Sequence, residues 1–139
     1  MHNNFFCIFL FLIFTTCAGY AQSPKHHVYY EKDYQKVWCE AHNGSTEVVL
    51  PDRARVDCVT NTHAIEFDFA KKWAESIGQA QYYGAVLDKT PGVVLIVENS
   101  SKDMRYVERV RKVADKRGMT LWLIYPEDVK KFQDNIFRL

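Results

Sequence analysis

Two acidic residues on neighbouring predicted strands are the clearest candidates for chemistry in this sequence. Asp57 and Glu66 lie nine residues apart, on segments that a short turn joins. A hairpin would place both carboxylates on one face, and Asp68 would share that face because side chains alternate along a strand. Burying three carboxylates together is costly unless a cation neutralises them. The pattern therefore predicts a site for Mg²⁺ (or Mn²⁺), which binds through one or two carboxylates. The alternative is an edge hairpin whose carboxylates face solvent.

A polar stripe on the helix expected after these strands points to the same place. Lys72, Ser76, Gln79 and Tyr83 fall within an arc of roughly 60° on a helical wheel. Because this helix would begin just after Asp68, Lys72 would lie nearest to the carboxylates. The stripe predicts a face that overlooks the acidic residues, and the alternative is an ordinary solvated helix face.

The elements that must position these residues follow from periodicity and turn signals. We expect helices at 29–42, 71–87, 101–117 and 127–137, and strands at 47–50, 55–60, 64–70, 93–97 and 121–125. The first three strands would form an antiparallel meander, and the later alternation of helix and strand predicts a parallel crossover. The expected fold class is α/β (α+β), with a central mixed sheet flanked by helices.

Three short segments together resemble the PD-(D/E)XK, or restriction-endonuclease-like, nuclease superfamily. They are Arg55-Val56-Asp57, Ala64-Ile65-Glu66-Phe67-Asp68 and Gln79-Ala80-Gln81-Tyr82-Tyr83. The resemblance implies an αβββαβ core over residues 29–97, Mg²⁺ bound by Asp57 and Glu66, and a Q-x-x-x-Y motif formed by Gln79 and Tyr83. The implied activity is metal-dependent phosphodiester hydrolysis, with DNA or RNA as the partner.

The sequence departs from the superfamily at one position, because Asp68 stands where a lysine is usual. Two alternatives follow. In the first, Lys72 (or Lys71) has taken over the role of that lysine, with Asp68 as an extra metal ligand or base. In the second, the protein is a catalytically inactive binding protein that keeps the nuclease fold.

Many members of the superfamily also carry an acidic residue on the first helix or first strand. Glu40 and Glu47 are the candidates in this sequence, and the spacing does not choose between them.

The N-terminus is typical of an export signal. Residues 5–14 are uninterrupted Phe, Cys, Ile and Leu, too few to cross a bilayer comfortably, and Gly19-Tyr20-Ala21 forms a small-x-small cleavage site. We predict a signal peptide at 1–21, a flexible leader at 22–28 and a single domain at 29–139. The protein would then be periplasmic or secreted, without stable membrane association after cleavage. The alternatives are an uncleaved anchor or a buried apolar strand.

Two cysteines would remain after cleavage, Cys39 and Cys58. An even pair in an oxidising compartment predicts one disulfide, and two buried free thiols are the alternative. The disulfide would rule out Cys39 as a nucleophile paired with His42.

A net charge of +1 provides no global basic field for binding nucleic acid, so any such binding must use a local patch. The helix expected at 101–117 is rich in lysine and arginine, and its basic residues form either a phosphate-binding patch or a solvated face. His26 and His27 could bind a metal ion, but they fall in the expected leader.

Overall fold

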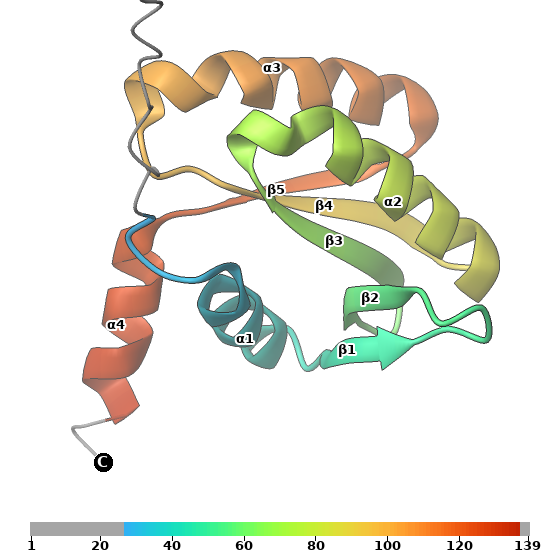
Figure 1. Ribbon diagram of the computed structural model, residues 1–139, viewed down its shortest axis with the longest axis horizontal. Coiled ribbons are helices and arrows are strands. Elements are labelled where there is room, and N and C mark those ends of the chain that lie inside the picture. The colour runs from blue at the N-terminus through green and yellow to red at the C-terminus, as the bar shows by residue number, and fades with distance from the viewer. Residues whose placement is uncertain (1–26, 137–139) are drawn as a thin grey trace, which may run out of the picture.

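Five strands form one mixed sheet in the order β1-β2-β3-β4-β5 (Figure 1). The structure is a computed structural model that describes residues 27–136. The strands are β1 (Ser45–Val49), β2 (Arg55–Val59), β3 (His63–Phe69), β4 (Thr90–Ile96) and β5 (Thr120–Ile124). The β1–β2 and β2–β3 pairs are antiparallel, whereas the β3–β4 and β4–β5 pairs are parallel. The predicted meander and parallel half of the sheet are thus confirmed.

Helices cover both faces of this sheet. They are α1 (Glu31–Ala41), α2 (Trp73–Leu87), α3 (Ser100–Arg117) and α4 (Pro126–Ile136), with a 3₁₀ turn η1 (Ala70–Lys72) before α2. Figure 1 shows α2 and α3 on one side of the strands and α1 and α4 on the other. The predicted mixed α/β architecture is confirmed, with element boundaries shifted by up to three residues.

Each face of the sheet has its own apolar core. On one side Tyr34 and Trp38 of α1 and Val129 of α4 pack with Phe67 of β3. On the other side Val107 and Val110 of α3 pack against Val93 and Leu95 of β4. Strand β4 is buried on both faces, as its continuous apolar run predicts.

Strand β4 begins earlier than expected. The strand was expected at 93–97, yet Pro91 and Gly92 also belong to β4 and pair with Ala64 and Ile65 of β3. Pro91 is tolerated because it is the second residue of the strand and precedes the pairing of β4 with β5, which begins at Gly92. A Cβ at Gly92 would come within 2.8 Å of the Trp122 ring, so this glycine allows close packing.

The N-terminal segment is described only from His27. The predicted signal peptide, residues 22–26 of the predicted leader and residues 137–139 lie outside the described residues. His27 stacks on Phe69, with ring centroids 3.5 Å apart, and its Nδ1 lies 2.7 Å from Glu98. Among residues 27–136, no helix has the length and apolar character needed to cross a membrane.

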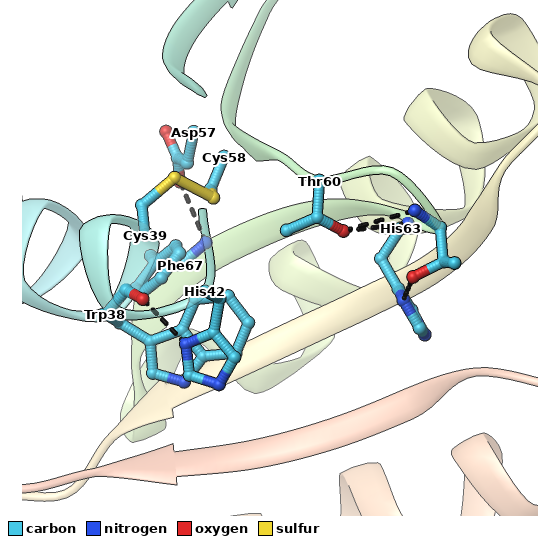
Figure 2. Close-up of a disulfide and its surroundings, with 9 residues drawn as sticks. Trp38, Cys39, His42, Asp57, Cys58, Thr60, His63 and Phe67 are labelled. Carbon is cyan, nitrogen blue, oxygen red and sulfur yellow. Dashed lines mark hydrogen bonds between the residues drawn. A yellow bond between two sulfur atoms is a disulfide. The ribbon is translucent and has the colours of Figure 1, made fainter. Parts of the chain in front are cut away.

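The predicted disulfide between Cys39 and Cys58 is present, and both cysteines are fully buried. It joins α1 to β2 with a Cα–Cα distance of 5.9 Å. Figure 2 shows the bridge next to Asp57, because Asp57 is the residue that precedes Cys58 in the chain. Because Cys39 is bonded, it is not a free thiol nucleophile.

Candidate active site

The hairpin of β2 and β3 opens where the acidic residues lie. The two strands pair only at Cys58–Ile65 and Val59–Ala64, near the turn. Beyond these pairs the Asp57 side chain bridges the strands, because its Oδ2 accepts a hydrogen bond from the Phe67 amide at 2.8 Å (Figure 2). The main chain of β3 therefore holds one oxygen of Asp57 in place.

Glu66 is buried, with 6% of its surface exposed, and it meets the polar stripe of α2. With its amide nitrogen turned toward Glu66, Gln79 donates hydrogen bonds to both carboxylate oxygens, at 3.2 Å to Oε2. Ser76 and Tyr83 are also buried on this side of α2. Ser76, Gln79 and Tyr83 of the expected stripe thus pack toward the sheet, whereas Lys72 is mostly exposed. The Ser76 hydroxyl donates to the Trp73 carbonyl, 2.9 Å away.

Asp68 is the most buried of the three strand carboxylates, with 3% exposed. Its Oδ1 is buried and has no hydrogen-bond partner in the part of the chain that the structure describes. The Lys72 ammonium lies 3.6 Å from this oxygen, within ion-pair range, while 57% of the Lys72 side chain is exposed. Lys72 therefore reaches the acidic cluster through Asp68.

Burial, together with neighbouring negative charges, raises the pKa of all three carboxyls. Burial raises the pKa of Asp57, and the Glu31 and Glu47 charges add to this, although the Phe67 amide opposes it. Burial also raises the pKa of Glu66, reinforced by Asp57 and Asp68. For Asp68 burial raises the pKa to about 7, against the lowering effect of Lys72. The surroundings thus favour the neutral form of each of the three carboxyls.

A pocket of about 560 Å³ lies over this cluster. It receives side chains from α1, β1, β2, β3 and α2. Its lining residues are Tyr30, Glu31, Lys32, Gln35, Glu47, Arg55, Asp57, Glu66, Gln79 and Tyr83. Four of the residues predicted for catalysis thus share one cavity wall. Asp68 and Lys72 lie outside this lining, at the start of α2.

The structure distinguishes between the two additional acidic candidates. Glu47 lines the pocket, and it lies opposite Asp57 because Thr46 pairs with Cys58 and Val48 with Val56. Its φ of 57° is unusual for a non-glycine residue in a strand. Glu47 also forms an ion pair with Arg55 at 2.9 Å. Glu40 is exposed and lines a different pocket, so it does not join the acidic cluster.

Glu31 is the acidic residue that sequence reasoning missed. It lies in the first turn of α1 and lines the pocket, and its charge contributes to the raised pKa of Asp57, Glu66 and Asp68. Burial raises its own pKa, while Lys72 lowers it. The available signal was helical spacing, because Glu31 precedes Tyr34 by one turn and so shares its inward face.

The donor set suits a hard cation, since carboxylate oxygens are the ligands that Mg²⁺ prefers. The Oδ1 of Asp68 has no hydrogen-bond partner among the described residues, and the raised pKa values show that the ionised carboxylates are disfavoured where they are buried. Across residues 27–136, no three His, Cys, Asp or Glu side chains stand close enough to enclose a metal ion. The residues fit an ion held by Asp57 and Glu66, because Mg²⁺ usually takes one or two protein carboxylates and keeps several waters.

No protein-family model, curated protein or solved structure matches this chain significantly.

Proposed function

We propose that this protein is a metal-dependent nuclease, a hydrolase that cleaves phosphodiester bonds. The observation that carries the proposal is the carboxylate cluster of Asp57, Glu66 and Asp68. Glu66 and Asp68 are buried, Asp57 and Glu66 line a pocket, and the Lys72 ammonium that pairs with Asp68 is mostly exposed. Structural carboxylates are normally exposed or paired, since an unpaired buried charge costs several kcal/mol. Perturbed titratable groups gathered in a cleft are typical of functional sites.

The order of elements supports a restriction-endonuclease-like fold. Helix α1, the meander β1–β2–β3, helix α2 and strand β4 follow one another as in an αβββαβ core. Asp57 lies on the second strand of the meander, Glu66 on the third, and Gln79 and Tyr83 on the helix that follows. This placement is the one that the motif resemblance implies.

Asp57 and Glu66 would hold Mg²⁺ (or Mn²⁺). The bound ion would supply charge neutralisation at the phosphate and lower the pKa of water. Gln79 fixes the Glu66 carboxylate through its amide. The Phe67 amide fixes Asp57 in the same way. These contacts orient the two ligands before any substrate arrives.

The positive groups around the pocket are suited to a phosphate. Lys32 and Arg55 line the cavity, and Lys72 lies outside this lining, beside Asp68. Asp68 raises the pKa of the Lys72 ammonium, so this lysine stays protonated. In this proposal Lys72 stabilises charge that develops on the phosphate, as cationic clamps do in phosphoryl transfer.

A cleavage assay with matched lysine variants tests the proposal. The purified protein is incubated with Mg²⁺ or Mn²⁺ on labelled single- and double-stranded DNA and RNA. We expect Asp57→Asn to abolish cleavage and Lys72→Met to lower its rate by about 10²-fold or more. Lys71→Met is the control, because Lys71 is an exposed neighbouring lysine.

Two outcomes would reject the nuclease proposal. The first is an absence of cleavage by the wild-type protein with either metal. The second is an Asp57→Asn variant that cleaves as fast as wild type. A drop for Lys71→Met equal to that for Lys72→Met would reject the role of Lys72 alone.

One observation favours a second function, namely a non-catalytic binding protein that retains the nuclease fold. Lys72 is mostly exposed, and it pairs with Asp68 and not with Asp57 or Glu66. This second function predicts that Mg²⁺ leaves the melting temperature unchanged. The nuclease proposal predicts that Mg²⁺ raises it and that Glu66→Gln removes the rise.

A further inference from the structure

The outer surface of α3 carries positive charge in a regular pattern. The helix has seven basic and three acidic residues, in a chain whose net charge is only +1. Five of the basic residues follow one another at alternating spacings of three and four. They are Lys102, Arg105, Arg109, Lys112 and Lys116, and all five are exposed. We call this set the basic stripe.

The basic stripe occupies the side of α3 that points away from the core. On a helical wheel its five members fall within an arc of roughly 80°. The buried residues Asp103, Val107, Val110 and Ala114 lie on the opposite side. From Lys102 to Lys116 the stripe is about 21 Å long, at 1.5 Å per residue.

The acidic residues of α3 lie outside this arc. Asp103 is buried and accepts a hydrogen bond from the Asn99 amide at the start of the helix. Glu108 forms an ion pair with Arg111, which also lies off the stripe. A surface built only to be solvated would gain from pairing its charges along the helix. The stripe lysines make no side-chain hydrogen bond or ion pair within residues 27–136.

The stripe connects to the candidate active site through the start of α2. Helix α3 packs against η1, which contains Lys71 and Lys72. The Arg109 guanidinium lies over the Trp73 ring, 5.2 Å from its centroid. Trp73 directly follows Lys72, whose ammonium is 3.6 Å from Asp68. Positive charge thus runs from the acidic cluster to the end of α3.

We infer that the basic stripe is the surface along which a polynucleotide backbone runs as it leaves the pocket. Arg105 and Arg109 lie over aromatic rings, and none of the five cations has an acidic partner among the described residues. Such a row, about 21 Å long, complements a row of phosphates and not a single small anion. The direction of the polynucleotide, from the pocket onto the stripe, rests on the proposed nuclease function. The binding surface itself is tested separately, without metal and without cleavage.

The test compares two variants that each lose three lysines. The stripe variant is Lys102→Gln/Lys112→Gln/Lys116→Gln. The control is Lys36→Gln/Lys130→Gln/Lys131→Gln, whose lysines are exposed on α1 and α4, the helices on the opposite side of the sheet. Both variants have the same net charge, so any difference reports the position of the charges.

Binding is measured by fluorescence anisotropy in EDTA on a 30-nucleotide fluorescein-labelled DNA, single-stranded and as a duplex. We expect the stripe variant to bind at least tenfold more weakly and the control within twofold of wild type. The slope of log K against log salt should flatten by about 2 for the single strand in the stripe variant. Equal weakening in both variants, or no binding by wild type, would overturn the inference.

Cleavage with Mg²⁺ is then measured on the same DNA. Stripe-dependent binding without any cleavage would reject the nuclease proposal and keep the binding surface. Cleavage by the stripe variant at the wild-type rate, at DNA concentrations below Kd, would reject the binding surface and keep the nuclease.

Discussion

Asp68 links the proposed chemistry to the stability of the fold. It is almost fully buried, one of its oxygens has no hydrogen-bond partner among the described residues, and its nearest cation is 3.6 Å away. A residue in this state destabilises the folded chain when it is ionised. Such a cost is retained in proteins where a ligand or substrate compensates it.

The pKa of Asp68 predicts how stability without metal depends on pH. Burial raises this pKa to about 7 in the folded protein, compared with about 4 in an unfolded chain. Between pH 4 and 7 the folded protein therefore holds a proton that the unfolded chain has lost. The stability that this proton provides is present at low pH and is lost as the pH rises through about 7.

Urea unfolding in EDTA at pH 5 and pH 8 measures this effect. We expect the free energy of unfolding to fall between these values, by about 2 kcal/mol for Asp68. Asp68→Asn should reduce the fall, whereas Asp115→Asn, an exposed acid on α3, should not. Stability that is constant or rises from pH 5 to pH 8 would contradict the prediction.

At the scale of elements, α1 is fixed to the sheet at both ends. Near its C-terminus the disulfide joins Cys39 to Cys58 of β2, the residue after Asp57. Near its N-terminus Glu98, which follows β4, accepts hydrogen bonds from the Val28 amide at 2.7 Å and the Tyr34 hydroxyl at 3.0 Å. Glu31 lies between these attachments, so both set its position over the carboxylates.

Gly44 packs closely against the disulfide. A Cβ at this position would come within 2.6 Å of both sulfur atoms. Cys39→Ala/Cys58→Ala should lower the free energy of unfolding by about 3 kcal/mol, since the bridge joins residues that are 19 positions apart in the chain. Gly44→Ala should then cost less in the bridge-free protein than in the oxidised protein. Four urea curves provide this double-mutant cycle, and an equal cost in both backgrounds would contradict the close contact.

The Glu98 attachment predicts a local change in dynamics. Glu98→Gln keeps the size of the side chain but removes the charge that its three partners share. We expect a loss of about 1–2 kcal/mol in the free energy of unfolding, and faster hydrogen exchange at residues 28–34. Glu127→Gln, an exposed acid on α4, is the control. Unchanged exchange at Val28 and its neighbours would show that Glu98 does not hold this segment.

At the scale of the whole molecule, one mixed sheet separates two surfaces with different properties. The side of α1 and α4 carries the disulfide and the aromatic core of Tyr34, Trp38 and Phe67. The side of α2 and α3 carries the polar stripe and the basic stripe. The carboxylate cluster lies where the β2–β3 hairpin opens between these sides, with access to the pocket.

The signal peptide predicted from the sequence leads to a prediction for the exported protein. Disulfides persist in oxidising compartments, which agrees with a periplasmic or secreted protein. We expect the intact mass of the exported protein to correspond to a chain that begins at Gln22, with Cys39 and Cys58 oxidised. A mass that still includes residues 1–21 would reject cleavage after Ala21.

The sequence by itself determined the order of the elements, the antiparallel meander and the disulfide. It also placed Asp57 and Glu66 on adjacent strands, and Gln79 and Tyr83 on one side of α2. These features depend on local periodicity and short turns, which are encoded within a few neighbouring residues.

The tertiary structure decided which other element each face of a helix or strand packs against. It brought in Glu31 and Glu47 and left out Glu40, turned the polar stripe of α2 toward the sheet, and kept Pro91 inside β4. The physical reason is that α1 and α2 reach the hairpin through packing between segments distant in the chain. Periodicity specifies which side chains share a face of an element, whereas contacts between elements depend on the volume and charge of every side chain between them.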